Sequence, residues 1–152
     1  MIAVDGSPES WFAADVGIAL AAAKNATVTF LHASTETFER VAERDPLLPN
    51  RREDLAAAEP VLGEALARAR GAEVDAELVL SRGSTSEQIA AEILGLAEEI
   101  EADLIVAGSR GRGAVVSSVI GSVSRALLRA APVATLIVKV PDVRTSRSPR
   151  TE

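Results

Sequence analysis

The chain contains no cysteine and only one histidine among its 152 residues. The absence of cysteine excludes a disulfide framework and any zinc site built on thiolates. Aromatic residues make up only 3% of the chain although 47% of it is hydrophobic, so the core must be assembled from Ala, Val, Leu and Ile. At this length we expect about one domain with a single sizeable core.

Positive charge is also scarce, because 16 basic residues face 22 acidic ones and leave a net charge of -6. This balance argues against non-specific binding to nucleic acid or to anionic membranes. No apolar run approaches the roughly 20 residues that span a bilayer, and the N-terminus shows no secretory signal pattern. We therefore expect a cytoplasmic protein that has neither nucleic acid nor a membrane as its partner.

Strand-like and helix-like segments alternate along the chain. Strands are expected at residues 1–4, 26–33, 73–80, 103–108 and 133–140, and helices at about residues 8–23, 51–70, 85–100 and 122–130. Such an order predicts an α/β fold in which a parallel sheet carries helices on both faces. Residues 73–80 alternate between apolar and polar, as in a half-exposed strand, whereas residues 103–108 read as buried on both faces. Residues 34–52 are expected to form a long loop.

Several helix boundaries can be read from local patterns. The first helix should start with Ser7 as N-cap and Pro8 at the first helical position. Pro60 should kink or divide the second helix. Ser84 and Glu87 fit a capping box for the third helix. One apolar face of the first helix, which we expect to face inward, is formed by Phe12, Val16, Ala19, Leu20 and Ala23.

The sequence GSRGRG lies directly after the buried strand 103–108, and a second glycine, Gly121, is followed at once by Ser122 and a helical pattern. Glycine lets the backbone approach a ligand closely, and a helix N-terminus offers free N–H groups to an anion. The P-loop pattern is absent, and GRGAVV breaks the dinucleotide fingerprint at its last position. The glycines therefore indicate a phosphate site of another kind.

The stretch GSRGRGAVVSSVIGS matches G-x2-G-x9-G-[ST], which is the ATP-binding signature of the universal stress protein family. The segments VDGS, LHA, GSTSEQI and APVATLIVK, each at a strand end or in the last strand, are also similar to this family. The resemblance covers nearly the whole chain, from residue 2 to residue 140. The nine-residue spacer makes the motif fairly specific.

This resemblance implies a Rossmann-like, open parallel five-stranded sheet of order 3-2-1-4-5 with helices on both faces. It also implies an adenine nucleotide across the ends of the first and fourth strands, either ATP, with Mg²⁺ held through its phosphates, or ADP, AMP or cyclic AMP. Asp5 would contact the ribose and adenine region, and Ala33 would hold the adenine through its backbone. The residues that would line the ribose and phosphates are Gly108, Arg110, Gly111 and Gly113. Those that would bind phosphate are Gly121, Ser122, Val123 and Ser124.

Only four residues precede Asp5, so the first strand should be short, as it also would be if native N-terminal residues were missing. We expect a domain over residues 1–140 and a disordered tail over residues 141–152. Residues 133–140 are nearly all apolar, and the implied order makes them a sheet edge, which invites pairing with another chain. The resemblance likewise implies a homodimer, here through residues 134–140.

The nucleotide is expected to act as a regulatory ligand read by an unidentified signalling partner, with no catalytic residue and at most slow hydrolysis. The alternative is an ATP-using enzyme, although neither an S-G-G-x-D-S loop nor paired histidines in H-x-G-H occur. A family member without nucleotide is a weaker alternative. His32 is expected to be packed or hydrogen-bonded instead of catalytic. Structural roles also stay open for other positions: a turn or cap for Asp5, solvated loop charges for Arg110 and Arg112, an N-cap for Ser122 and a tight strand exit for Gly108.

Overall fold

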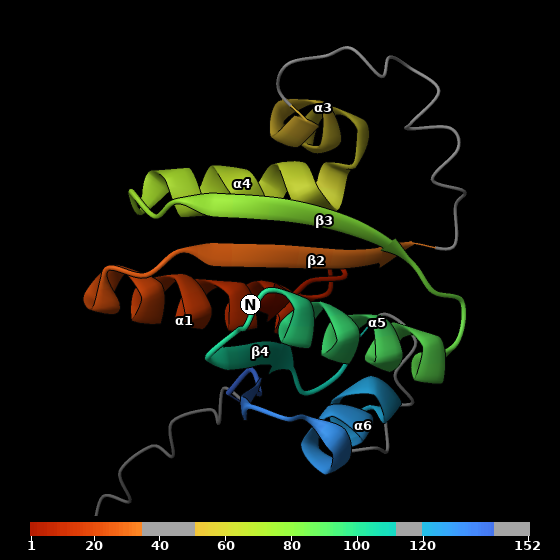
Figure 1. Ribbon diagram of the computed structural model, residues 1–152. Coiled ribbons are helices and arrows are strands. Elements are labelled where there is room, and N and C mark those ends of the chain that lie inside the picture. Colours follow the sequence, from red (N-terminus) through yellow and green to blue (C-terminus); the bar gives the residue numbers. More distant parts are fainter. Residues whose placement is uncertain (35–50, 112–119, 142–152) are drawn as a thin grey trace, which may run out of the picture.

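Five parallel strands form one sheet in the order β3-β2-β1-β4-β5 (Figure 1). The computed structural model describes residues 1–34, 51–111 and 120–141. The strands are β1 (Ile2–Ala3), β2 (Val28–Ser34), β3 (Ala76–Arg82), β4 (Leu104–Gly108) and β5 (Ala134–Val138). Both the parallel sheet and its predicted order are confirmed.

The central strand β1 is only two residues long, as expected from the short segment before Asp5. It pairs on one side with β2, where Ile2 is opposite Phe30, and on the other with β4, where Ile2 is opposite Val106. β2 and β3 pair over their full seven residues. The site-bearing centre of the sheet is therefore its shortest strand, and it is held from both sides.

Helices cover both faces of the sheet, as predicted. α1 (Pro8–Lys24) and α4 (Pro60–Gly71) pack on one face, and α5 (Ser86–Glu99) and α6 (Ser122–Ala130) lie side by side on the other (Figure 1). The core is divided accordingly: Phe30 and Leu62 belong to the cluster under α1 and α4, and Leu31 and Ile93 to the cluster under α5 and α6. Among the described residues, no helix is long and apolar enough to cross a membrane.

The start of α1 is confirmed, but its predicted inner face is wrong. The Ser7 side chain accepts a hydrogen bond from the Ser10 amide, and Pro8 opens the helix. Phe12 and Leu20, however, are 37% and 40% exposed. The residues that face the sheet are Ser10, Ala13, Ala14, Gly17, Ile18 and Ala21. Small side chains let α1 lie close to the sheet, so that a Cβ on Gly17 would come within 2.5 Å of the Ile2 Cδ1 atom.

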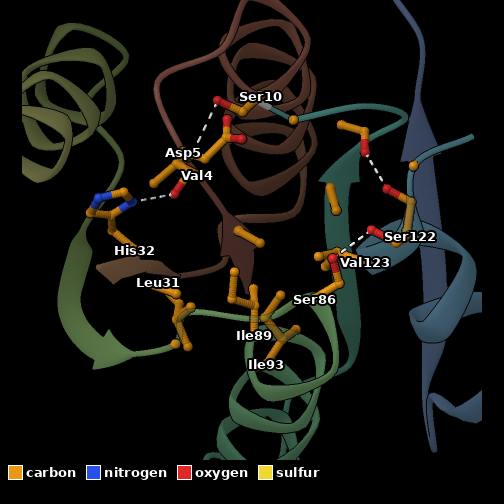
Figure 2. A pocket seen from close by; sticks show the side chains of 18 of the residues that line it. Val4, Asp5, Ser10, Leu31, His32, Ser86, Ile89, Ile93, Ser122 and Val123 are labelled. Carbon is orange, nitrogen blue, oxygen red and sulfur yellow. Dashed lines mark hydrogen bonds between the residues drawn. The ribbon is translucent and has the colours of Figure 1, made fainter. Parts of the chain in front are cut away.

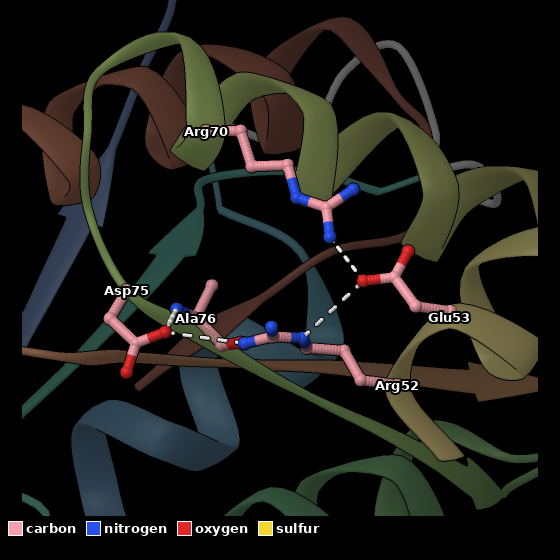
Figure 3. A network of polar contacts seen from close by, with 5 residues as sticks. All are labelled: Arg52, Glu53, Arg70, Asp75 and Ala76. Carbon is pink, nitrogen blue, oxygen red and sulfur yellow. Dashed lines mark hydrogen bonds and ion pairs between the residues drawn. The ribbon is translucent and has the colours of Figure 1, made fainter. Parts of the chain in front are cut away.

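Pro60 divides the expected helix 51–70, as predicted, into α3 (Arg51–Ala58) and α4. A polar network then fixes α3 against the end of α4 and the start of β3 (Figure 3). Arg52 Nη1 donates to the Ala76 carbonyl at 2.9 Å and lies 3.2 Å from Asp75 Oδ1. The Glu53 carboxylate pairs with the Arg70 guanidinium. This half of the molecule is thereby held together at the end opposite the strand termini that build the site.

The capping box of α5 is one residue later than predicted. Thr85 Oγ1 accepts from the Gln88 amide at 3.2 Å, and Gln88 Oε1 accepts from the Thr85 amide in return. Ser84 is not the N-cap but adds to the same turn, since its amide and hydroxyl both donate to Gln88 Oε1, at 3.0 and 2.9 Å. The sequence STSEQ permits both registers, and the longer amide side chain of Gln88 satisfies three donors at once.

The remaining strand predictions are confirmed in outline. β4 is buried along its centre. Residues 73–78 alternate between exposed and buried, as predicted, whereas the rest of the edge strand β3, from Val79 onward, is partly or fully exposed. β5 is the other edge, as expected. The predicted loop lies mostly outside the described residues, as does the predicted tail from residue 142 onward.

Candidate functional site

A cavity of about 530 Å³ opens at the carboxyl ends of β1, β2, β3 and β4, where the starts of α1, α5 and α6 also meet. In open parallel sheets the strand order reverses at such a place, and ligands bind there. The predicted site residues that fall within the described chain all line this cavity: Asp5, Ala33, Gly108, Arg110, Gly111, Gly121, Ser122, Val123 and Ser124. Gly113, and likewise Arg112, lie outside the described residues.

One side of the cavity is apolar. Leu31, in the middle of β2, lies near Ile89 and Ile93 of α5, with Val123 of α6 beside them (Figure 2). The spacing of the two isoleucines along the sequence predicts only the inner face of a helix, because spacing does not separate a core position from a cavity wall. This wall can hold a flat apolar or aromatic group, while polar groups of the strand ends bound the opposite side.

Asp5, directly after β1, is both a turn residue and part of the cavity. Its Oδ1 accepts from the Ser7 amide at 2.9 Å, and its own amide donates to Ser10 Oγ at 3.3 Å. The structural reading of Asp5 as a turn residue is thus supported. A Cβ on Gly111 would collide with the Asp5 carboxylate. Glycine at position 111 therefore lets the loop after β4 lie against this carboxylate.

The exit of β4 is tightly packed against the start of α1. A Cβ on Gly108 would lie 2.8 Å from the carbonyl carbon of Glu9 and 3.0 Å from the Ser10 amide nitrogen. The reading of Gly108 as a tight strand exit therefore has direct support. Arg110 is not a solvated loop charge: its guanidinium lies 3.3 Å from Glu9 Oε1, and its Nε has no hydrogen-bond partner among the described residues.

The start of α6 differs from the other described helix starts. Ser7, Glu59 and Thr85 cap α1, α4 and α5 with side-chain oxygens. The N-cap of α6 is Gly121, which has no side chain to accept from the first amides, so the reading of Ser122 as N-cap is wrong. Uncapped N–H groups and the helix dipole favour an anion at this end.

Ser124 contributes less than its sequence position suggests. Its hydroxyl donates to the Gly108 carbonyl at 2.7 Å, and the side chain is buried. The hydroxyl therefore ties α6 to the end of β4, and the amide nitrogen is what Ser124 can offer to a ligand. Gly121 reinforces the same junction, because its amide donates to the Ser109 carbonyl at 2.7 Å.

His32 is packed and hydrogen-bonded, as expected. Its Nδ1 lies 2.8 Å from the Val4 carbonyl, which can only accept, so Nδ1 carries the proton. The ring is buried, and its Nε2 lies 3.8 Å from Glu59 Oε1. It fixes the β1 exit just before Asp5. No cluster of metal-ligating side chains occurs in the part of the chain that the structure describes.

No sequence pattern indicated one of the contacts in the cavity. Ser86 Oγ, at the first position of α5, lies 2.6 Å from Ser122 Oγ, at the first position of α6 (Figure 2). The two residues are 36 positions apart. Serines are common at helix starts for reasons of capping, so nothing in the local pattern marks these two as partners.

The model of the universal stress protein family matches residues 1–139. A relative from Staphylococcus aureus strain USA300 that carries the same family name is 31% identical over 152 residues, covering 99% of this chain and 89% of its own. A crystal structure of a universal stress protein in complex with cAMP is 28% identical, with a TM-score of 0.65 over 91% of this chain and 93% of that one. The structure of a universal stress protein from Archaeoglobus fulgidus, 23% identical, has the same fold, with a TM-score of 0.66 over 91% and 96%. The chain belongs to the universal stress protein family.

Proposed function

We propose that this chain is a nucleotide-binding regulatory module of the stress response, which binds an adenine nucleotide in the cavity at the strand ends. The observation that carries the proposal is the uncapped start of α6, which opens into the same cavity as an apolar wall. An adenine nucleotide needs both features, since its base is flat and weakly polar and its phosphates are anionic. The solved family member at 28% identity is in complex with cAMP, which supports the same ligand class.

In the proposed complex the base lies against Leu31, Ile89 and Ile93 and is held by the backbone of Ala33. The ribose lies near Asp5. The phosphates lie between the loop after β4 and the start of α6, and they accept from amides of residues 122–124, while the bare Gly121 leaves room for them. The residues proposed for the ribose and phosphates, with Gly113 outside the described part, are Gly108, Arg110, Gly111, Gly113, Gly121, Ser122, Val123 and Ser124.

ATP is the proposed nucleotide, with Mg²⁺ bound through its phosphates and water. Among the described residues that line the cavity, Arg110 is the one with a side chain that is always cationic. Its Nε has no hydrogen-bond partner in the described chain, while Glu9 already balances part of its charge. One such cation suits a ligand of modest negative charge as well as ATP, so ADP, AMP and cAMP are compared with it in the experiment below.

The nucleotide is proposed to act as a ligand, with hydrolysis slow or absent. Phosphoryl transfer requires a positioned nucleophile and charge neutralisation at the γ-phosphate. Of the carboxylates in the described part of the chain, Asp5 lines the cavity, and it already accepts from the Ser7 amide. The imidazole Nδ1 of His32 donates to a backbone carbonyl. An ATP-using enzyme on the same scaffold is the alternative function.

The test is mass spectrometry of nucleotide released from freshly purified protein, followed by calorimetric titration with ATP, ADP, AMP and cAMP. We expect an adenine nucleotide to be released and rebound. At 100 times Kd, the ligand should stabilise the folded protein by about 2.7 kcal/mol, which a thermal-shift series measures. A phosphate-release assay with turnover near ~1 s⁻¹ or faster, abolished by one side-chain change, would establish the enzyme instead.

We also propose a homodimer through residues 134–140. β5 is a sheet edge on which Thr135, Leu136 and Ile137 are only partly covered, so antiparallel pairing about a two-fold axis could extend the sheet. Val138 is buried within the protomer, so Ile137→Lys is the better probe. Leu128→Lys, at a residue 51% exposed on α6, is the control. Ile137→Lys should sediment as a monomer and the control as a dimer. A monomeric wild type at micromolar concentration would contradict the proposal.

The signalling partner and the cytoplasmic location stay predictions from the sequence.

A further inference from the structure

We infer that Ser86 is a positioning residue for the phosphate end of the ligand, because it orients the hydroxyl of Ser122 toward the phosphate. The inference rests on the proposed nucleotide function and adds a residue outside the glycine motif. Ser86 belongs to α5, on the other side of the cavity from the loop after β4.

The geometry brings two helix starts together at one point of the cavity. Ser86 and Ser122 each occupy the first helical position, and their hydroxyl oxygens are 2.6 Å apart. Both line the cavity, and neither is buried. In Figure 2 the pair lies beside Val123, at the boundary between the apolar wall and the start of α6. A ligand that spans the cavity can therefore reach the pair.

The hydroxyl of Ser86 is not needed to cap its own helix. Thr85 Oγ1 and Gln88 Oε1 already complete the capping box of α5. The start of α6 is different, because Gly121 offers its amides no side-chain acceptor. The serine pair thus links the start of α5, which its own residues cap, to the start of α6, whose N-cap has no side chain.

Counting protons shows what the pair can offer to an anion. Each serine hydroxyl has one proton to donate and two acceptor positions. The bond between them uses one proton, and the second is free. If Ser86 donates to Ser122, the Ser122 proton can point to a phosphate oxygen, which only accepts. Hydrogen bonds in such a chain polarise one another. Ser86 would therefore strengthen and direct a donor that the family motif already supplies.

In a rival reading the pair is a strut, meaning a purely structural hydrogen bond that holds α5 against α6. The two readings differ in how the effect depends on ligand charge. Loss of a strut would weaken binding of every ligand in the cavity, charged or not. Loss of a phosphate-orienting hydroxyl would weaken AMP and ATP and leave adenosine, which lacks the phosphate, unaffected.

The experiment is calorimetric titration of Ser86→Ala with adenosine, AMP and ATP. We expect a roughly three- to tenfold weaker Kd for AMP and ATP, the range of one net hydrogen bond, and an adenosine Kd within about twofold of the wild type. Ser86→Thr, which keeps a hydroxyl, should restore phosphate binding. Ser84→Ala is the matched control, because Ser84 lies in the same turn but donates its hydroxyl to Gln88. It should bind all three ligands as the wild type does.

A double-mutant cycle with Ser122→Ala completes the test. If Ser86 acts through Ser122, then removing Ser86 from the Ser122→Ala protein should weaken AMP no further. Four outcomes would each overturn the inference. Ser86→Ala could lose equal affinity for adenosine and AMP, lose no affinity, or fail to fold. The losses of AMP affinity could also be fully additive in the double variant. If the wild type binds none of the three ligands, the proposed function itself fails, and that result is distinct from all the others.

Discussion

The glycines at the two ends of the site serve different purposes. Gly108, at the exit of β4, has backbone of α1 within 3.0 Å of where a Cβ would be. For Gly121, at the start of α6, the described atoms nearest to an added Cβ would be the Ser109 carbonyl oxygen at 3.4 Å and the Arg110 Cα at 3.5 Å, which are ordinary contact distances. The protein's own packing therefore requires the first glycine and would tolerate a side chain at the second.

This difference shows that one sequence motif can combine two kinds of constraint. Gly108 and Gly111 let the loop after β4 lie against Glu9 and Asp5, which concerns the fold. Gly121 itself offers the first amides of α6 no side-chain acceptor. If the proposed function is correct, that position is kept bare for the ligand. Substitutions at the two ends should then separate stability from binding.

Gly121→Glu should give the largest effect. Its carboxylate would lie at the start of α6, where it repels phosphate and occupies the ligand's space. We expect a loss on the order of 100-fold in ATP affinity by calorimetry. The folded protein should not suffer, since a negative charge near a helix N-terminus is favourable. Unchanged affinity in a folded Gly121→Glu protein would remove Gly121 from the site.

Gly108→Ala should show the opposite pattern, with the loss in stability. The added methyl group meets backbone of α1, which cannot move aside as a side chain can. Overpacking of this kind costs about 1–3 kcal/mol, and urea denaturation without nucleotide measures it. A free energy of unfolding equal to that of the wild type would mean that the β4 exit is less tight than the comparison assumes.

Thr85→Ala tests how much the side-chain cap of α5 stabilises the protein, in contrast to α6, whose N-cap has no side chain. It removes the side-chain half of the capping box and should cost about 1 kcal/mol of unfolding free energy. Chemical denaturation of the two proteins in parallel gives the value. A loss much smaller than this would show that Gln88 alone closes the helix.

Gly121→Ala should have the smallest effect on stability, within about 0.5 kcal/mol of the wild type. The backbone at this position is extended, with φ at -69°, so alanine adopts it without strain. The same denaturation series measures it. A large destabilisation would place Gly121 in the same class as Gly108, and the distinction between the two ends would fail.

The alternation of strand-like and helix-like segments predicted a parallel sheet with helices on both faces, because these patterns are local. The sheet order and the residues at the strand ends were implied by the resemblance to the universal stress protein family. Prediction from the sequence failed where packing selects among equivalent local choices. The apolar face of α1 was assigned by its large residues, Phe12 and Leu20, but close approach to the sheet selected the small ones. The two serine-threonine registers before α5 could not be separated without knowing which side chain reaches back.

The contact between Ser86 and Ser122 and the apolar wall could not be predicted at all. Each depends on how α5 and α6 lie on the same face of the sheet, which no short pattern records. The spacing of Ile89 and Ile93 shows that they face inward, yet only the assembled strand ends show that part of that interior is a cavity.

The pairing of Ile2 with Val106 means that the centre of the sheet joins residues from the start of the chain with others far along it. Contacts so distant in sequence are slow to form. β1, β2 and β3 can associate first, but the cavity needs β4 and α6 as well. A ligand bound there recognises only the finished sheet. We therefore expect nucleotide to slow unfolding and to leave the folding rate unchanged, since its contacts form after the rate-limiting step. During synthesis, such a ligand would bind only after the whole domain has folded, and it would then stabilise the completed structure.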